Sequence, residues 1–258
     1  MNYEKWDEIL APYQHAVEEL KVKFKNIRKE FLTKGEYSPI EFVTGRTKKI
    51  SSIISKANRL DTNDIEGEIE DIAGIRIMCQ FVEDIYTIVE LIKNRTDMTV
   101  INEKDYITNF KESGYRSYHL IIKYPINSIA GSKEIHCEIQ IRTLAMNFWA
   151  TIEHSLNYKY KQHIPKEIQD KLKLAADSAF NLDEQMLEIK DEIKDAQRLF
   201  EVKSDNTINV ISNTTNMGMS YSEFEGDGIL TVNDDVKPFS IRLTKVNDKG
   251  AVLEGAEF

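Results

Sequence analysis

The sequence predicts a mixed α/β (α+β) fold built on one β-sheet with helices around it. Three observations predict this class. Apolar residues first recur at helical steps, short β-branched runs then alternate with another helical stretch, and two long helical patterns close the region. The order helix, strand, helix, strands, helices is typical of a single sheet covered by helices.

Two helices are expected before the first strand. In residues 13–31, apolar residues recur every three or four positions, and Gly35 follows as a stop signal. A second helix is expected over 40–59. The period then changes in 73–81, where β-branched residues bounded by glycine and two acids predict a partly buried strand. Residues 83–94 return to helical spacing, so a helix is expected there.

The next part of the chain predicts a hairpin followed by two helices. Residues 117–124 and 134–142 have the composition of strands, and the polar loop at 127–132 suits a hairpin connection. Helices are expected over 144–160 and 165–200, the second opening with proline in its first turn.

The composition changes near residue 205. Residues 205–258 hold nine acidic and four basic residues, so they contribute −5 to the net charge of −9, and they hold five of the eleven glycines. Three strand-like runs separated by Asn- and Asp-rich turns predict a small antiparallel β appendage, which should lean on the core or on another subunit. We therefore expect a domain over 1–204 and an acidic β-rich extension over 205–258, to which the sequence assigns no role.

The composition also limits the classes of function. The 258 residues are 41% hydrophobic and 30% charged, and no stretch reaches the roughly 18 consecutive apolar residues of a membrane span. The first residues lack a secretory signal pattern, so a cytoplasmic protein is expected. The negative charge argues against non-specific binding to duplex DNA, and two cysteines in apolar runs are typical of buried thiols. A phosphate site must therefore be a local basic cluster.

Such a basic cluster lies in residues 44–59. Arg46 and Lys48 follow a glycine, and four polar residues then recur at steps of three and four on one helical face: Lys49, Ser52, Lys56 and Arg59. A hydroxyl among cations suits a polyphosphate, although a solvated basic face has the same pattern. No Gly-rich phosphate loop of the GxxxxGK[ST] or GxGxxG type occurs, so any phosphate would be bound by side chains.

Two further segments bring polar groups to predicted strands. Asp71 precedes the strand that carries Arg76, which is expensive to bury unpaired. Lys111, Tyr115 and His119 lie at the entry of a later strand. They could stack a base and hold phosphates, or form a polar loop that anchors core tyrosines.

The strand predicted over 134–142 has a polar face. Alternation sends five polar side chains to one side: Glu134, His136, Glu138, Gln140 and Arg142. That face either meets solvent or is the floor of a cleft. A zinc site from His136 and Cys137 is disfavoured, because neighbours on a strand point apart.

In this order, the segments resemble the synthetase domain of the RelA/SpoT superfamily, and the RelQ-like small alarmone synthetases in particular. The shared motifs span about residues 10–200 and lie at 42–59, 71–76, 114–119, 138–143 and 149–154. The resemblance implies a nucleotidyltransferase-like mixed sheet. It also implies a GTP pyrophosphokinase, which transfers the β,γ-pyrophosphate of ATP to the 3′ hydroxyl of GTP, GDP or GMP to make (p)ppGpp alarmones in the stringent response.

The resemblance implies roles for individual residues. On the ATP side, Arg46 and Arg76 would bind the adenine, and the phosphates would meet Lys48, Ser52, Lys56 and Arg59. Asp71 would hold Mg²⁺, and Glu138 would be a second metal contact or the base for the 3′ hydroxyl. On the acceptor side, Tyr115 would stack on guanine, Lys111 and His119 would contact phosphates, and Gln140 and Arg142 would line the cleft.

The resemblance also implies a homotetramer built by the terminal helices. A basic cleft between subunits would bind (p)ppGpp as an allosteric ligand through Lys21, Lys25, Arg28, Phe42 and Thr44, although an exposed basic face explains the same cations. Single-stranded RNA is a second candidate regulator.

The resemblance does not extend to the hydrolase activity of the long family members. Their hydrolase half uses a His-Asp motif, and no histidine precedes an acid here, so synthesis without hydrolysis is expected. Two alternatives stay open. One is a toxic relative that pyrophosphorylates tRNA or an adenosine nucleotide, and the other is a silent nucleotide- or RNA-binding module, which would be expected to lack Asp71 or Glu138.

Overall fold

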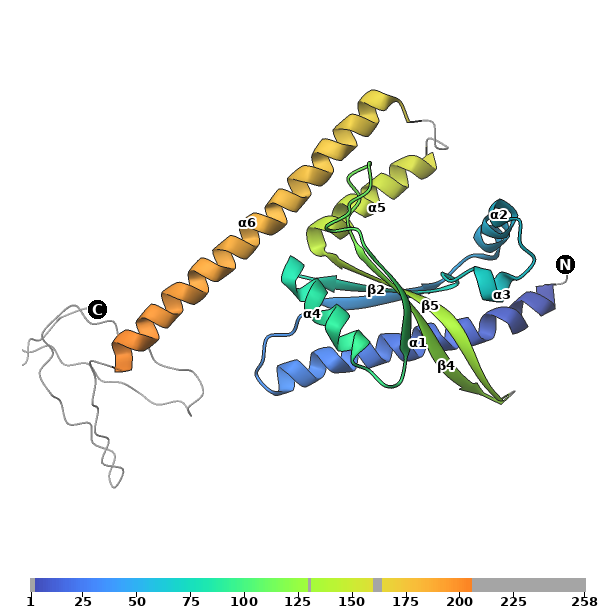
Figure 1. The fold of residues 1–258 in the computed structure, drawn as a ribbon, viewed down its shortest axis with the longest axis horizontal. Coiled ribbons are helices and arrows are strands. Elements are labelled where there is room, and N and C mark those ends of the chain that lie inside the picture. The colour runs from blue at the N-terminus through green and yellow to red at the C-terminus, as the bar shows by residue number, and fades with distance from the viewer. Residues whose placement is uncertain (1–2, 130, 160–163, 206–258) are drawn as a thin grey trace, which may run out of the picture. The chain divides into compact units, whose positions relative to one another are not determined.

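The computed structural model describes residues 3–129, 131–159 and 164–205 (Figure 1). A five-stranded mixed sheet lies at its centre, in the order β1-β2-β5-β4-β3. The strands are β1 (Phe42–Thr47), β2 (Ala73–Cys79), β3 (Thr99–Asp105), β4 (Tyr118–Ser128) and β5 (Gly131–Thr143). β2 and β5 are parallel, and the other neighbouring pairs are antiparallel. The predicted single mixed sheet is therefore confirmed.

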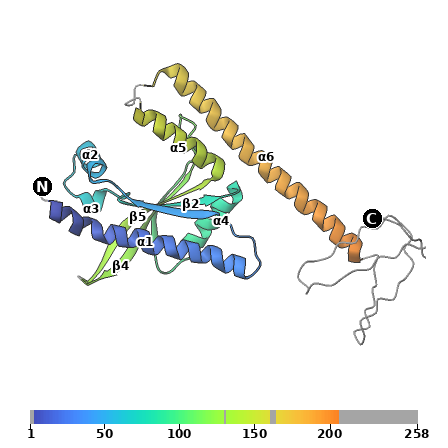
Figure 2. The ribbon, with the colours of Figure 1, turned by 180° about the vertical axis from the view of Figure 1, so that it is seen from behind.

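Two helices bury their apolar faces against this sheet. The helix α1 (Tyr3–Thr33) lies along the sheet, as the view from behind shows (Figure 2). Its apolar residues and those of α4 (Val82–Lys93) join alternate residues of β2, β4 and β5 in one hydrophobic core. Because alternate residues of a strand point to opposite faces, this packing leaves the polar alternates of β2 and β5 for the other face.

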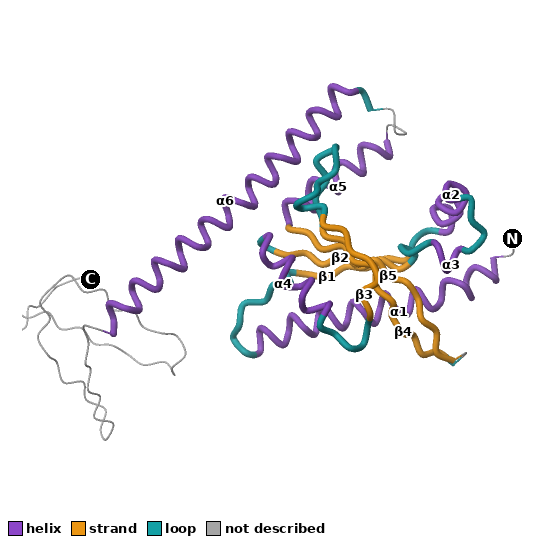
Figure 3. The backbone as a smooth tube through the Cα atoms, viewed as in Figure 1, coloured by secondary structure: helices purple, strands orange, loops and turns teal. Residues whose placement is uncertain are grey.

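The remaining helices are those between the first two strands and those after the last strand (Figure 3). The helices α2 (Ile50–Leu60) and α3 (Ile65–Glu68) lie between β1 and β2 in the sequence, whereas α5 (Leu144–Lys159) and α6 (Lys166–Asp205) follow β5. The Trp149 indole of α5 donates to the backbone oxygen of Leu172 on α6 at 2.8 Å. None of the helices in the described ranges is long and apolar enough to cross a membrane.

Three expectations from the sequence were wrong in detail. The helix expected over 40–59 begins only at Ile50, because Phe42–Thr47 is the edge strand β1. Three β-branched residues favour that strand, and Gly45 allows close packing: a Cβ there would lie 2.8 Å from Val17 of α1. The edge strand β3 and the short helix α3 were not predicted. The predicted hairpin is longer than expected, since its strands extend through most of 127–132.

The predicted C-terminal β appendage lies outside the described residues and stays a prediction. The two cysteines, Cys79 and Cys137, are both buried free thiols, as expected.

Candidate active site

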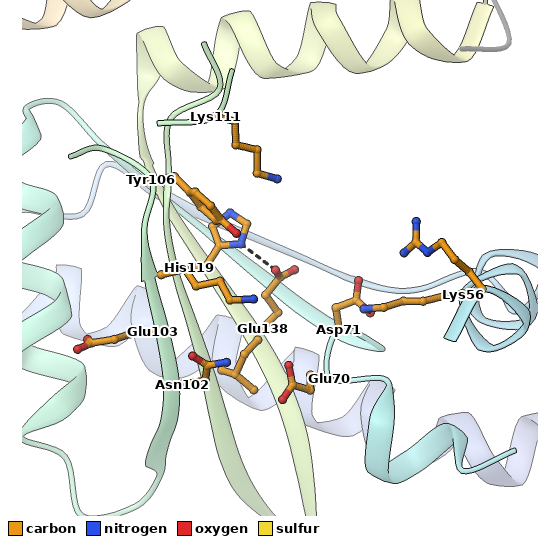
Figure 4. Close-up of a pocket in the computed structure, with 12 residues that line it drawn as sticks. Lys56, Glu70, Asp71, Asn102, Glu103, Tyr106, Lys111, His119 and Glu138 are labelled. Carbon is orange, nitrogen blue, oxygen red and sulfur yellow. Dashed lines mark hydrogen bonds and ion pairs between the residues drawn. The ribbon is translucent and has the colours of Figure 1, made fainter. Parts of the chain in front are cut away.

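Two adjacent cavities share the carboxylates of Asp71 and Glu138. The larger cavity, of about 370 Å³, is drawn in Figure 4, where Lys56, Lys111 and His119 also line it. The smaller cavity, of about 160 Å³, lies beside β1 and β2 and includes Arg46 and Arg76. The two acids that the sequence singled out therefore meet both cavities.

The parallel pairing of β2 with β5 explains why the two acids come together. Asp71 lies two residues before β2, and the register pairs Gly74 of β2 with Glu138 of β5. The register also places Arg76 opposite Gln140, and residues 64 positions apart in the chain could not be paired from periodicity. Two members of the polar face predicted for β5, Glu138 and Gln140, thus line the cavities.

The Asp71 carboxylate is held by two lysines. Lys48, which follows β1, contacts Oδ2 at 2.5 Å, and Lys56 of α2 contacts Oδ1 at 2.9 Å. Burial alone would raise the pKa of Asp71, but the hydrogen bonds and charges of both lysines outweigh burial and lower it. Asp71 is therefore ionised at neutral pH.

The Glu138 carboxylate is held by a histidine and an amide. His119 Nδ1 lies 3.0 Å from Oε1, and Gln140 Nε2 donates to Oε2 at 2.8 Å. Burial would raise the pKa of Glu138, and the nearby Asp71 adds to this, but the bond and charge from His119 and the bond from Gln140 outweigh both and lower it. Glu138 is therefore an ionised and firmly oriented carboxylate.

A continuous polar network joins the two cavities through Glu138 and Gln140. The Gln140 Oε1 atom accepts from Arg76 Nε at 3.3 Å and from Arg142 Nη2 at 2.9 Å. Arg142 Nη2 also donates to the Tyr115 hydroxyl at 2.6 Å, which lies 2.8 Å from His119 Nε2. Burial and the charges of Arg142 and Arg46 lower the pKa of Arg76. The network couples the orientation of five side chains around Glu138.

The Tyr115 ring lies between two cations. Lys111 Nζ is 4.9 Å from its centroid, and the Arg142 guanidinium carbon is 5.1 Å from it. Lys111 Nζ also lies 4.8 Å from the Tyr106 ring, which packs edge-on against Tyr115 and His119. Tyr115 lines neither of the two cavities, so a base could stack on it only after neighbouring side chains move.

Of the other predicted residues, some line a cavity and others reach the site only through a neighbouring side chain. Arg59 lines the larger cavity, whereas Lys48 reaches the site through Asp71. Ser52 is exposed on α2 and lines neither of the two cavities, and Arg142 reaches the site through Gln140 and Tyr115.

The residues predicted for the allosteric cleft lie on α1 and β1. Lys21 pairs with Glu18 at 2.9 Å, Lys25 is exposed, and Arg28 donates to the backbone oxygen of Ile40 at 3.0 Å. The other two residues predicted for the cleft lie on β1. Phe42 is 42% exposed, and Thr44 lines the smaller cavity.

Several residues of the larger cavity were missed by sequence reasoning: Glu70, Asn102, Glu103, Lys104, Tyr106 and Ile121. Three of them lie on β3, a mostly exposed edge strand of sequence TVINEKD. Its lack of regular alternation gave no signal, whereas Tyr106 could have been noticed as an aromatic residue close to the Lys111 segment.

The donor set fits a magnesium ion. Among the described residues there is no group of three or more His, Cys, Asp or Glu side chains that could hold a metal. The two carboxylates that meet in the cavities supply the hard oxygen ligands that Mg²⁺ prefers, and Mg²⁺ commonly takes one or two protein carboxylates together with substrate phosphates.

The chain is similar to known proteins of one family. A family profile described as "Region found in RelA / SpoT proteins" matches residues 45–163. GTP pyrophosphokinase YjbM of Bacillus subtilis is 52% identical over 205 residues, which are 79% of this chain and 97% of that protein.

Two solved structures of small alarmone synthetase 1 from Bacillus subtilis are also similar. The complex with its product pppGpp has a TM-score of 0.71 and 53% identity, covering 74% of this chain and 98% of that one. The complex with AMPCPP has a TM-score of 0.66 and 48% identity, covering 74% of this chain and 99% of that one. Similarity of this extent confirms the resemblance drawn from the motifs: the chain belongs to the RelA/SpoT family, among the small alarmone synthetases.

Proposed function

We propose that the chain is a synthetase-only GTP pyrophosphokinase that transfers the β,γ-pyrophosphate of ATP to the 3′ hydroxyl of a guanosine nucleotide. The observation that carries this proposal is the pair of carboxylates, Asp71 and Glu138, shared by two neighbouring cavities. A donor nucleotide and an acceptor nucleotide in these cavities would meet at that pair. The AMPCPP and pppGpp complexes of the Bacillus subtilis relative support both ligand classes.

The adenosine of ATP would occupy the smaller cavity, and its phosphates would extend toward α2 into the part of the larger cavity that Lys56 and Arg59 line. Arg46 and Arg76, which line that cavity, would enclose the adenine, since a guanidinium plane attracts an aromatic ring by stacking and by charge. The phosphates would be met by Lys48, Lys56 and Arg59, with Ser52 as an exposed hydroxyl on the same helix. Because both lysines now pair with Asp71, phosphates that attract them would free the Asp71 oxygens.

Asp71 and Glu138 would hold Mg²⁺. The ion, when bound, would neutralise phosphate charge and help to align the triphosphate. Phosphoryl transfer depends mainly on alignment and charge neutralisation, so the cluster of lysines and arginines contributes to the same end.

The acceptor would occupy the larger cavity. Its phosphates would contact Lys111 and His119, and guanine would stack on Tyr115 once Lys111 or Arg142 moves. Gln140 and Arg142 would line the cleft. Glu138, held by His119 and Gln140, would accept the proton of the 3′ hydroxyl. The new bond joins the 3′ oxygen to the β-phosphorus of ATP. The bond between that phosphorus and the α,β-bridging oxygen breaks, and AMP leaves with this oxygen and the bonding electron pair.

We also propose a cytoplasmic homotetramer with an allosteric site for (p)ppGpp. Four large apolar residues of α6 are about half exposed at helical steps of four, three and four, and so form a seam that another subunit could cover: Leu182, Met186, Ile189 and Ile193. Lys21, Lys25 and Arg28 on α1, with Phe42 and Thr44 on β1, would form the cleft for the regulator. Single-stranded RNA is the second candidate for that cleft.

The proposal is tested by incubating the purified full chain with labelled ATP, Mg²⁺ and one acceptor at a time, followed by chromatography. GMP, GDP and GTP serve as acceptors, and ATP and tRNA serve as controls. Labelled guanosine product with equimolar AMP is the expected result. Label transferred only to tRNA or to an adenosine nucleotide would identify a toxic relative, and nucleotide binding without any transfer would identify a silent module.

A further inference from the structure

The acceptor segment, defined here as residues 106–117 between β3 and β4, lies against α6 and also lines the larger cavity through Tyr106 and Lys111. At Gly114 the backbone φ is +87°, and a Cβ built there would lie 2.5 Å from the Cβ of Ala176 on α6. Only glycine combines this backbone conformation with such a close approach. The segment that carries Lys111 and Tyr115 is therefore in direct contact with α6.

Arg116 fastens the segment to α6. Its guanidinium donates to Asp177 Oδ1 of α6 at 3.0 Å and to the backbone oxygen of Gly114 at 3.1 Å. It also lies between two rings, 4.4 Å from the centroid of Phe110 and 4.5 Å from that of Phe180. Arg116 is only 8% exposed, so its charge depends on Asp177 for compensation.

Arg116 lines neither of the two cavities, so it is not in a position to touch substrate. Its neighbour Tyr115 reaches the larger cavity through His119, which lines that cavity. Tyr115 packs on the small apolar cluster of Trp149, Ala150 and Ala176, while its hydroxyl contacts Arg142 and His119. Displacing Arg116 would therefore move the side chains at the acceptor cavity and leave Arg46 and Arg76 of the other cavity in place.

We propose that α6 positions the acceptor segment through Arg116 and Asp177, so that binding of the guanosine nucleotide depends on this contact and binding of ATP does not. This inference rests on the proposed function for its assignment of the two cavities. Arg116 and Asp177 are positioning residues.

The test compares Asp177→Asn with Asp170→Asn, since Asp170 is an exposed aspartate of the same helix. Dissociation constants for GTP and AMPCPP are measured by calorimetry on the full chain. Asp177→Asn should weaken GTP about tenfold, the loss of about 1.4 kcal/mol, and change AMPCPP binding less than about twofold. In an Arg116→Gln background, Asp177→Asn should add nothing. Equal weakening of both ligands by Asp177→Asn, or no weakening of GTP, would overturn the proposal.

Hydrogen exchange of the nucleotide-free chain gives an independent readout. The amides of Lys111 and Gly114 are hydrogen-bonded within the segment, to Tyr115 and Lys111 respectively. Their exchange should accelerate in Asp177→Asn and stay unchanged in Asp170→Asn, and unchanged exchange in Asp177→Asn would refute the positioning role. A wild-type chain that does not bind GTP would contradict the proposed function, whereas the exchange result would still decide whether α6 orders the segment.

Discussion

Asp71 and Glu138 are kept ionised by different partners. Two lysine ammonium groups compensate Asp71, and these groups are mobile enough to turn toward a phosphate. Glu138 is compensated by His119 and by the Gln140 amide, which are themselves fixed by neighbouring side chains. The first carboxylate is thus suited to exchanging partners and the second to keeping a fixed direction.

Replacing Asp71 by asparagine should lower turnover by about two decades or more at an intact fold, because the amide cannot supply the negative charge that a divalent ion needs. The measurement is the steady-state rate with saturating ATP, Mg²⁺ and GTP, together with a thermal melt. Asp61→Asn is the control, since Asp61 is exposed and its φ of +53° suits asparagine. Near-normal turnover in the Asp71 variant would remove this residue from the metal site.

The pKa of Glu138 predicts a pH effect for His119→Gln. The ordinary pKa of glutamate is about 4.3. In the wild type the pKa of Glu138 is lower than this, so Glu138 stays deprotonated at a pH where an ordinary glutamate takes up a proton. Removing His119 removes its bond and charge, and burial then raises the pKa. The acidic limb of the turnover profile should therefore move to higher pH. His15→Gln, on the exposed side of α1, is the control. An acidic limb at the wild-type position would show that Glu138 is not the group that titrates.

At the level of single residues, the sequence predicted the placement of a side chain where one element determined it. Strand alternation was enough to place Glu138, Gln140 and Arg142 on the polar side of β5. The contact between Arg116 and Asp177 joins residues 61 positions apart and has no local pattern, so it could not be predicted.

At the level of elements, the main error concerned β1. The helix expected to begin at residue 40 begins at Ile50, and the β-branched residues of Phe42–Thr47 favour a strand. Pairing of β1 with β2 depends on their tertiary contact, which a local pattern does not contain. The long helical patterns of α1, α4, α5 and α6 were predicted because each repeats over many turns.

The contact of α6 with the end of β5 predicts a stabilising substitution. Asp183 is 5% exposed and accepts a hydrogen bond from Thr143 Oγ1 at 2.6 Å. Burial raises its pKa to about 6, and the bond from Thr143 only partly opposes this. The folded state therefore prefers the protonated acid, and the charged form costs stability above that pKa. From the ordinary value of about 3.9, the penalty at pH 8 is on the order of 2–3 kcal/mol.

Asp183→Asn imitates the protonated acid, so it should raise the melting temperature at pH 8 and have a much smaller effect at pH 5. Thermal unfolding of both chains at the two pH values is the measurement. The exposed Glu184→Gln on the same helix should change neither value. A destabilising effect at pH 8 would mean that the charged carboxylate is favoured in the folded protein.

At the level of the whole molecule, α6 has two separate faces. One face contacts the acceptor segment and the end of β5 through Ala176, Asp177 and Asp183. The other carries the exposed seam that begins at Leu182 and ends at Ile193. A rigid helix that both contacts the acceptor segment and meets a second subunit would link assembly to acceptor binding.

The seam predicts the effect of a single charge on assembly. A lysine at position 189 would have to be buried between subunits without a partner, so Ile189→Lys should convert the proposed tetramer, about 120 kDa from four chains of 29.9 kDa, to smaller species. Light scattering coupled to gel filtration measures the mass. Asp191→Asn changes the net charge by the same amount at an exposed position of α6 and should leave the mass unchanged. If the Ile189→Lys chain keeps the wild-type mass, the subunits meet through another surface, and α6 would serve the acceptor segment alone.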